Sequence, residues 1–237
     1  MSAPASMMFP PIDSALSDPN GLLAVGGSLD PERLLAAYSA GIFPWYEQGQ
    51  PVLWWSPDPR AVLQPDKVHI ARSLRRAMRR GAYGLSMNRA FSAVIAACAA
   101  PRGEAGTWIT PEMQSAYVEL HQRGFAHSIE VWRDDDLVGG LYGVAVGKLF
   151  CGESMFSRAP DTSKMALVAL CKMLQLRRWP LLDCQLENPH LQTLGVTTIS
   201  RAAFKQYLPA ATGITPTAAG LGALPWQNTL ELLQDTL

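Results

Sequence analysis

Three consecutive β-like runs in the middle of the chain constrain its fold more than any other feature. Residues 127–133 (HSIEVWR) alternate between polar and apolar side chains, and three aspartates, 134–136, then provide a turn. An apolar, glycine-rich run follows over residues 137–147 (LVGGLYGVAVG), and a third run covers residues 148–156 (KLFCGESMF). Period-two alternation broken by turn residues is typical of antiparallel strands. The sequence therefore predicts a β-meander at the centre of the fold.

Helices are predicted on both sides of this meander. Residues 108–124 (WITPEMQSAYVELHQRG) place apolar side chains at i, i+3, i+4 and i+7, behind a capping Thr110 and a first-turn Pro111. Residues 163–179 (SKMALVALCKMLQLRRW) are apolar nearly all round, which indicates a buried helix, and residues 180–185 (PLLDCQ) indicate a short buried strand. The predicted fold class is α+β, with a mixed sheet packed on helices.

The first 62 residues have a different character, rich in Pro, Gly and aromatic side chains. Residues 29–44 (LDPERLLAAYSAGIFP) predict one helix that begins after a capping Asp30 and is stopped by Gly41 and Pro44. Four aromatic residues follow close together and favour the core of a small subdomain: Trp45, Tyr46, Trp54 and Trp55. We therefore predict a small N-terminal domain over residues 1–62, a second domain over 63–210, and a loosely structured tail over 211–237.

Composition excludes several classes of protein. Hydrophobic residues make up 48% of the 237 residues and charged residues 17%, which argues for a packed core and against disorder. The start lacks the pattern of a signal peptide, and no apolar run is long enough to span a membrane. The four cysteines show no CxxC spacing and are expected to be reduced, in a cytoplasmic protein. A zinc site at Cys184 and His190 would have too few ligands, so we predict no metal.

A stripe of arginines marks the second predicted helix region, residues 66–81 (DKVHIARSLRRAMRRG), which precedes another helix over residues 87–100 with Asn88 as its cap. Helical spacing at i, i+3, i+4, i+7 and i+8 puts five arginines on one face: Arg72, Arg75, Arg76, Arg79 and Arg80. Formal net charge is zero, so any nucleic-acid contact depends on a local patch of this kind. The stripe fits either a solvated helix face or a footprint on a phosphate backbone.

Two carboxylates are candidates for chemistry. Asp183 and Gln185 lie two apart on the predicted strand and therefore on one face, after two leucines that suggest burial. A buried Asp with a raised pKa could accept a proton, or it could be held structurally by backbone N–H groups. Asn188 and His190 follow in a loop and could orient this Asp or a ligand.

Glu153 is the second carboxylate, set among apolar residues after Gly152 and beside Ser154 and Ser157. It fits either a functional group or a buried ion pair with an arginine. The surrounding residues do not form a GxSxG nucleophile motif, and the chain contains neither GxGxxG nor a P-loop.

Several stretches together resemble the bacterial leucyl/phenylalanyl-tRNA–protein transferases. They include PNGLLAVGGSLDPERLLAAYSAGIFPW, LWWSPDPRAVL, GTWIT, HSIEVW, LVGGLYGVAVGKLFCGESMFS and LLDCQ, and the resemblance runs from about Phe9 to Tyr207. It implies a small N-terminal domain followed by a domain like those of N-acetyltransferases. The glycine-rich pyrophosphate loop of acetyl-CoA enzymes is absent, so neither CoA nor any other cofactor is expected.

The resemblance also implies an activity. The family transfers Leu or Phe, and Met less well, from aminoacyl-tRNA to proteins that begin with Arg or Lys, which marks them for degradation. The implied partners are Leu-tRNA, Phe-tRNA and these acceptor proteins, with no membrane, and we expect a monomer.

Residue roles follow from the same resemblance. Asp183 would take or relay the proton of the acceptor amine, or only orient that amine, with Gln185 holding the geometry. Glu153 would meet the cationic N-terminus and Asn188 would help to orient it. The arginine stripe would grip the tRNA acceptor stem. A pocket that excludes β-branched side chains would hold the aminoacyl group or stack on the terminal adenine, and it would consist of Tyr38, Trp45, Trp108, Tyr117, Leu141, Phe150 and Leu182.

Three other classes remain open from the residues alone. A thiol or serine acyl hydrolase would use Cys151 or Ser154 with His190 and Asp183. A non-catalytic tRNA- or degron-binding module would keep the arginine stripe without needing Asp183. An N-acetyltransferase would bind CoA and ignore tRNA.

Overall fold

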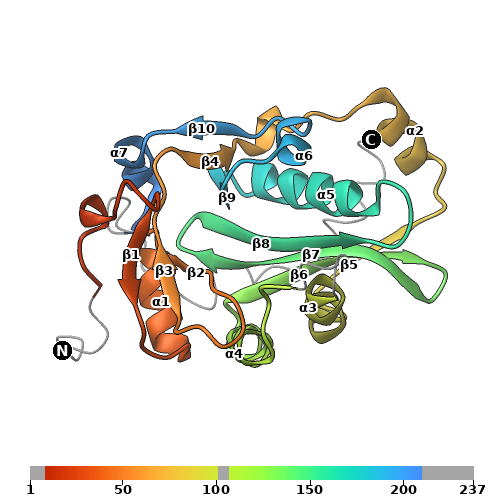
Figure 1. Ribbon diagram of the computed structural model, residues 1–237. Helices are drawn as coiled ribbons and strands as arrows, with labels where there is room; N and C mark the ends of the chain where they lie inside the picture. The colour runs from red at the N-terminus through yellow and green to blue at the C-terminus, as the bar shows by residue number, and fades with distance from the viewer. Residues whose placement is uncertain (1–8, 101–106, 210–237) are drawn as a thin grey trace.

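A computed structural model describes residues 9–100 and 107–209, whose strands form two sheets (Figure 1). The smaller sheet has the order β1-β3-β2 and consists of β1 (Leu22–Val25), β2 (Phe43–Pro44) and β3 (Leu53–Trp55). The larger sheet has the order β10-β4-β9-β8-β7-β6-β5. Its strands are β4 (Arg60–Leu63), β5 (Gly84–Met87), β6 (Ala126–Arg133), β7 (Asp136–Val146), β8 (Leu149–Ser157), β9 (Leu181–Gln185) and β10 (Thr197–Ile199).

The predicted meander forms the centre of the larger sheet. Strand β6 pairs with β7, and β7 with β8, both antiparallel and along most of their length. The chain then passes through α5 (Thr162–Leu176) and returns as β9, which pairs with β8 in parallel. A helix between two parallel neighbours is the usual crossover connection. This mixed sheet packed on helices confirms the predicted fold class.

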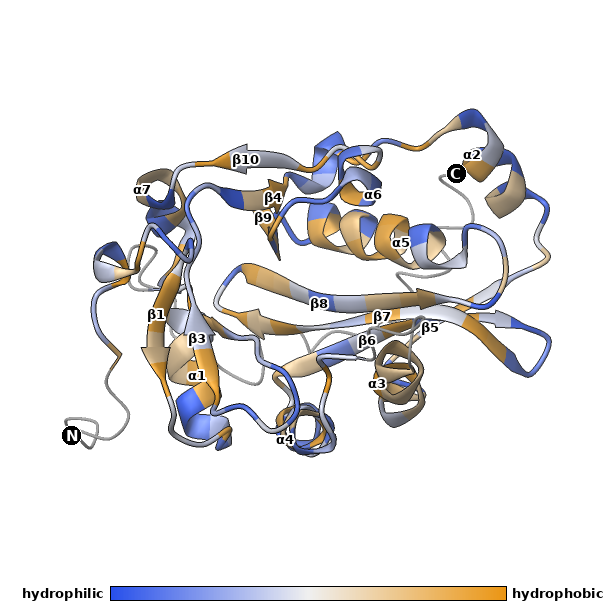
Figure 2. Ribbon diagram, viewed as in Figure 1, coloured by the Kyte–Doolittle hydropathy of each residue, from blue (hydrophilic) through white to orange (hydrophobic). Residues whose placement is uncertain are grey.

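Helices cover both faces of the larger sheet (Figure 1). On one face lies α5, which is apolar along its length in Figure 2, together with α2 (Arg72–Arg79). The other face carries α1 (Pro31–Ser39), α3 (Phe91–Ala99) and α4 (Pro111–Gln122). Each face has its own apolar cluster, so the sheet is buried on both sides. Within the described ranges, none of the helices has the length and apolarity needed to cross a membrane.

Helix α4 follows the sequence prediction closely. The Thr110 side chain accepts a hydrogen bond from the backbone N–H of Met113, and Pro111 occupies the first turn. The four buried residues of this helix are the predicted ones: Met113, Ala116, Tyr117 and Leu120. The N-terminal signal and the apolar spacing therefore predict both the start of this helix and its buried face.

Two helix starts differ from their prediction. The helix expected over residues 66–81 begins only at Arg72, because the backbone N–H of His69 bonds to the carbonyl of Leu194 and holds the chain outside a helix there. Asn88 does not cap α3, because its backbone is left-handed (φ 58°) and its side chain contacts the backbone N–H of Ser128 on β6. Instead, the carboxylate of Glu130 on β6 accepts hydrogen bonds from the backbone N–H groups of Arg89 and Ala90, which precede this helix.

The sequence did not predict the strands at the two edges of the larger sheet. Strands β4 and β10 pair with each other at one edge, and β5 pairs with β6 at the other. The short helices α6 (Pro189–Gln192) and α7 (Arg201–Phe204) flank β10. The small sheet ends at Trp55 and the large one begins at Arg60, and the proposed domain boundary at residue 62 stays a prediction. The tail over residues 211–237 lies outside the described residues.

A buried ion pair joins β4 to its neighbour β9. The guanidinium of Arg60 donates from Nε to Oδ1 of Asp183 at 2.8 Å and from Nη2 to Oδ2 at 2.7 Å. Both side chains are 1% exposed. Burial would lower the pKa of Arg60, but the charge and hydrogen bonds of Asp183 outweigh it and raise that pKa. A bidentate geometry of this kind compensates two charges that would otherwise be costly to bury.

Replacing Arg60 by Met should lower the free energy of unfolding by about 3–5 kcal/mol, because Asp183 would be left buried without a partner. Urea unfolding measures this loss. The matched control is Arg123→Met, which removes an arginine that pairs with Glu32 and Glu119 at the surface. That control should cost much less, because water screens an exposed ion pair. Equal losses in the two variants would contradict the proposed importance of the buried pair.

Candidate active site

The candidate site lies where β8 and β9 part. The two strands pair through Leu149–Leu181, Phe150–Leu182 and Cys151–Asp183, and the register ends there although β8 continues to Ser157. A cavity of about 490 Å³ opens beyond the last pair. Both diverging segments line it, Gly152 to Met155 from β8 and Cys184 to Leu186 from β9. The end of the strand pairing therefore creates the cavity.

A β-bulge aims Glu153 at this opening. Strand β8 pairs with β7 through Gly152–Gly143 and then Ser154–Tyr142, which leaves Glu153 as the extra residue on its strand. A Cβ atom at residue 143 would lie 2.2 Å from the Cys151 carbonyl oxygen, so the bulge requires glycine there. Bulges commonly redirect a side chain next to a site. Here the redirected group is the carboxylate.

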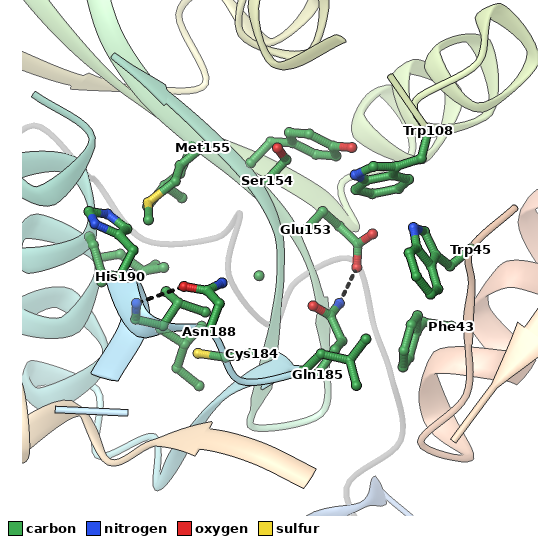
Figure 3. Close-up of a pocket in the computed structure, with 18 of the residues that line it drawn as sticks. Phe43, Trp45, Trp108, Glu153, Ser154, Met155, Cys184, Gln185, Asn188 and His190 are labelled. Atoms are coloured by element: carbon green, nitrogen blue, oxygen red, sulfur yellow. Dashed lines mark hydrogen bonds between the residues drawn. The ribbon is translucent and has the colours of Figure 1, made fainter. Parts of the chain in front are cut away.

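Gln185 connects the ion pair to Glu153. Its backbone has a left-handed conformation (φ 58°), and its backbone N–H donates to Oδ1 of Asp183 at 3.0 Å. Its side-chain Nε2 donates to Oε1 of Glu153 at 2.8 Å, which is the dashed line at the centre right of Figure 3. Asp183, already held by Arg60, thus fixes the turn of backbone that presents Gln185 to the cavity.

Glu153 is partly buried and receives hydrogen bonds on both oxygens. Tyr117 donates its hydroxyl to Oε2 at 3.0 Å, opposite the bond from Gln185. Burial raises the pKa of Glu153 to about 7, and hydrogen bonds from Tyr38 and Tyr117 oppose this rise. A carboxylate with a pKa near neutrality can both attract a cation and take up a proton at physiological pH.

Apolar and polar side chains both line the cavity, and Figure 3 labels several of them. Apolar side chains from the sheet and from α5 form one part of the lining: Leu141, Met155, Leu167, Leu170 and Leu182. Polar groups line it as well, and they include Glu153, Gln185, Asn188 and His190. Phe43, Trp45 and Trp108 form a third, aromatic wall. Such a cavity suits a ligand with an apolar end and a polar, reactive end.

Seven of the residues predicted for catalysis or the side-chain pocket line this cavity: Trp45, Trp108, Leu141, Glu153, Leu182, Gln185 and Asn188. Four others do not. Asp183 lies beneath the cavity in its ion pair, Phe150 is 1% exposed and packs against Gly143, and the hydroxyls of Tyr38 and Tyr117 lie behind Glu153. The arginine ion pair that was one of the two alternatives for Glu153 is made by Asp183 instead.

Sequence reasoning missed several lining residues, chiefly Phe43, Met155, Leu167 and Leu170. The two leucines belong to α5, which is apolar nearly all round, so its sequence gives no sign of which residues face the cavity. Asn188 was predicted, but its Oδ1 is occupied, because it accepts from the backbone N–H of Leu191 and caps α6. Only its amide nitrogen is left to meet a ligand.

The structure argues against Cys151 as the nucleophile of an acyl hydrolase. Cys151 is 1% exposed, and burial raises its pKa well above the ordinary value, which keeps the thiol protonated and unreactive. Cys184 and His190 both line the cavity, but among the described residues no group of three or more potential ligands could hold a metal ion.

The five arginines form a second candidate site on α2. All of them are exposed, and together they line a surface groove of about 380 Å³. Leu74 is the buried residue of this helix, and it packs in the same apolar cluster as the residues of α5. The helix therefore presents its guanidinium groups on one side, as the spacing predicted.

Comparison with known proteins identifies relatives. The family described as leucyl/phenylalanyl-tRNA protein transferase matches residues 62–209, and the N-terminal domain of the same family matches residues 27–58. A leucyl/phenylalanyl-tRNA–protein transferase from Pseudomonas entomophila (strain L48) is 59% identical over 204 residues, which are 86% of this chain and 90% of the relative. One from Stutzerimonas stutzeri (strain A1501) is 58% identical over 203 residues, 85% of this chain and 90% of the relative.

Similar solved structures are much more distant. A GCN5-related N-acetyltransferase from Kribbella flavida has a TM-score of 0.39 and 10% identity, and the match covers 70% of this chain and 59% of that one. The structure of L-PGS from Bacillus licheniformis has a TM-score of 0.38 and 11% identity, with 67% and 51% covered. Likeness at these scores says nothing about activity.

The stability of the fold should depend on pH through Glu153. Its pKa is raised from 4.5 to about 7, so the folded state binds this proton more tightly than the unfolded state does. This tighter binding stabilises the fold fully below pH 4.5, and the stabilisation is lost as the pH rises to about 7. The free energy of unfolding should therefore fall less between pH 5 and pH 8 in Glu153→Gln than in the wild type. Ser154→Ala removes a neighbouring hydroxyl but no ionisable group and should follow the wild type. Parallel curves for the wild type and Glu153→Gln would contradict the raised pKa.

Proposed function

Because the chain belongs to the leucyl/phenylalanyl-tRNA–protein transferases, a family of tRNA-dependent aminoacyltransferases, we propose that it transfers Leu or Phe, and Met less well, to the α-amino group of proteins that begin with Arg or Lys. The new N-terminal residue marks the acceptor protein for degradation through the N-degron pathway. This activity places the protein in the cytoplasm, where aminoacyl-tRNA is available.

The observation that carries this proposal is the junction of apolar and polar walls in one cavity. A Leu or Phe side chain would pack against Leu141, Leu170 and Leu182, and this would orient the ester carbonyl toward the polar lining residues. There, Glu153 is the one carboxylate among the described lining residues. A cationic acceptor amine would meet this carboxylate next to the ester.

The reaction requires the protein mainly to position the amine and the ester and to transfer a proton. An aminoacyl ester is already activated, so attack by an amine forms the C–N bond and expels the ribose hydroxyl of the tRNA. Holding the two reactants together can supply roughly 7–11 kcal/mol of the barrier. An α-amine has a pKa of about 7.7–8, close to that of Glu153, so proton transfer between them is nearly balanced.

Within this proposal Asp183 orients and Glu153 accepts the proton. Both carboxylate oxygens of Asp183 are bound to Arg60, and the side chain is buried away from the cavity. Its remaining hydrogen bond is to the backbone of Gln185. Because Nε2 of Gln185 is held by Glu153, its Oε1 can accept a hydrogen bond from the amine. Asp183 therefore serves the orienting role that the sequence had left open.

The binding-module alternative predicts tRNA binding without turnover, whereas the transferase predicts a measurable product. Labelled leucine supplied as Leu-tRNA should be transferred to a model protein that begins with Arg. The matched control acceptor is the same protein with its α-amine acetylated, which cannot attack and should receive no label. Gln185→Leu removes the hydrogen-bonding amide and should lower kcat by about 10–100-fold. No transfer by a folded wild type that binds Leu-tRNA would leave the binding module as the better account.

The arginine stripe on α2 would contact the phosphate backbone of the tRNA acceptor stem. Arg75→Ala combined with Arg76→Ala should weaken tRNA binding several-fold at moderate salt and lower the slope of log K against log salt by about 1–2. Filter binding over a range of salt concentrations measures both quantities. Arg123→Ala is the matched control, because Arg123 follows α4 on the opposite face of the larger sheet and pairs with Glu32 and Glu119. An unchanged salt slope in the double variant would place the tRNA elsewhere.

A further inference from the structure

Two buried tyrosines reach the site from behind. Tyr38 on α1 and Tyr117 on α4 are 1% and 0% exposed. Their hydroxyls bond to each other, and the Tyr117 hydroxyl lies 3.0 Å from Oε2 of Glu153. Neither residue lines the cavity. Both therefore act on the site only through Glu153.

The hydrogen bonds have a definite direction. Tyr117 has one hydroxyl proton, and because it donates this proton to Glu153, its oxygen must accept the proton of Tyr38. The second oxygen of Glu153 accepts from Gln185. Burial raises the pKa of both tyrosines well above the ordinary value, so both remain donors. The chain of donors ends on the carboxylate and leaves Oε1 of Gln185 for the acceptor amine.

We propose that Tyr117, supported by Tyr38, is a positioning residue for the transfer reaction, which holds Glu153 in the orientation and the ionised form that the acceptor amine requires. This inference rests on the proposed function, because it assigns Glu153 to the acceptor amine. It adds two residues from the far side of the sheet to a site whose cavity they do not touch.

A purely structural role does not account for both hydroxyls. Phenylalanine fills the same space without a polar atom to bury. Tyr142 packs edge-on against Tyr117, with ring centroids 5.5 Å apart, and its buried hydroxyl has no hydrogen-bond partner among the described residues. This part of the core therefore tolerates a ring with an unpaired hydroxyl. The two hydroxyls that are paired converge instead on the one carboxylate that lines the cavity.

The test is the pH dependence of kcat/KM for transfer of Leu from Leu-tRNA. Transfer should rise with pH as Glu153 ionises. In Tyr117→Phe the carboxylate loses a charge-assisted hydrogen bond, so the midpoint should move upward by about one pH unit. Transfer at pH 7 should then fall several-fold and approach the wild-type rate at higher pH. Tyr38→Phe should move the midpoint in the same direction by less, and it tests the proposal even if Tyr117→Phe fails to fold.

Two controls distinguish a shift in the midpoint of the pH profile from a general loss of stability. The acceptor amine is the same in every assay, so a difference between variants belongs to the enzyme. Tyr83→Phe removes a hydroxyl that binds Arg133 at the far edge of the sheet and should keep the wild-type midpoint. Adding Tyr117→Phe to Glu153→Gln should give no further shift, because the group that Tyr117 acts on has gone. An unchanged midpoint in folded Tyr117→Phe and Tyr38→Phe would overturn the proposal.

Failure of the proposed function would look different. A wild type that transfers no leucine would refute the activity but not the positioning. In that case a carbon-13 NMR titration of the Glu153 carboxyl still compares the wild type with Tyr117→Phe. A higher pKa in the variant would support the positioning role, and equal values would refute it.

Discussion

The buried pair between Arg60 and Asp183 is the interaction on which the rest of the site depends. Arg60 also donates to the carbonyl of Gly41 at 3.1 Å, and its guanidinium lies 4.8 Å and 4.6 Å from the ring centroids of Phe43 and Phe204. One side chain thus fastens the end of α1, strand β2, helix α7 and strand β9. Charge pairing of this quality is required because either group alone would be too costly to bury. Asp183, once fixed, determines the backbone of Gln185, and Gln185 in turn contacts Glu153.

The cavity results from local departures from regular sheet geometry, each with its own cause. The bulge at Glu153 adds a residue to β8, and the left-handed backbone of Gln185 turns β9 away immediately after its last pair with β8. Regular strands would have continued to pair and closed the gap with backbone hydrogen bonds. Because the divergence occurs beside α5, the gap acquires an apolar lining, while Glu153 and Gln185 remain polar. The site therefore combines an apolar pocket with polar, reactive groups.

Local patterns predicted the meander, α4, the buried α5 and the fold class, because each depends on periodicity within one segment. They also located Glu153, Gln185 and Asn188, since polar residues in apolar surroundings are conspicuous. What they could not provide was pairing across the chain. Arg60 and Asp183 are 123 positions apart, so nothing local indicated which of the two candidate carboxylates would hold an arginine. The same limit applies to the short strands β4 and β10, because β10 pairs with β4, and β4 pairs with β10 and β9, which lie far away in the sequence. The family resemblance placed Tyr38 and Tyr117 in the pocket, yet their hydroxyls lie behind it as hydrogen-bond donors.

The small N-terminal sheet is a structural part of the site. Within eight positions the chain supplies Tyr38 to the hydroxyl chain, the Gly41 carbonyl to Arg60, Phe43 to the guanidinium and Trp45 to the cavity wall. Residues from the larger sheet alone would leave Arg60 with an unsatisfied donor, Tyr117 without its partner and the cavity open on its aromatic side. Packing of this segment against the larger sheet therefore completes the hydrogen bonds behind Glu153 and the aromatic wall of the cavity. Substitutions in the N-terminal core can in this way alter chemistry at a carboxylate that they never contact.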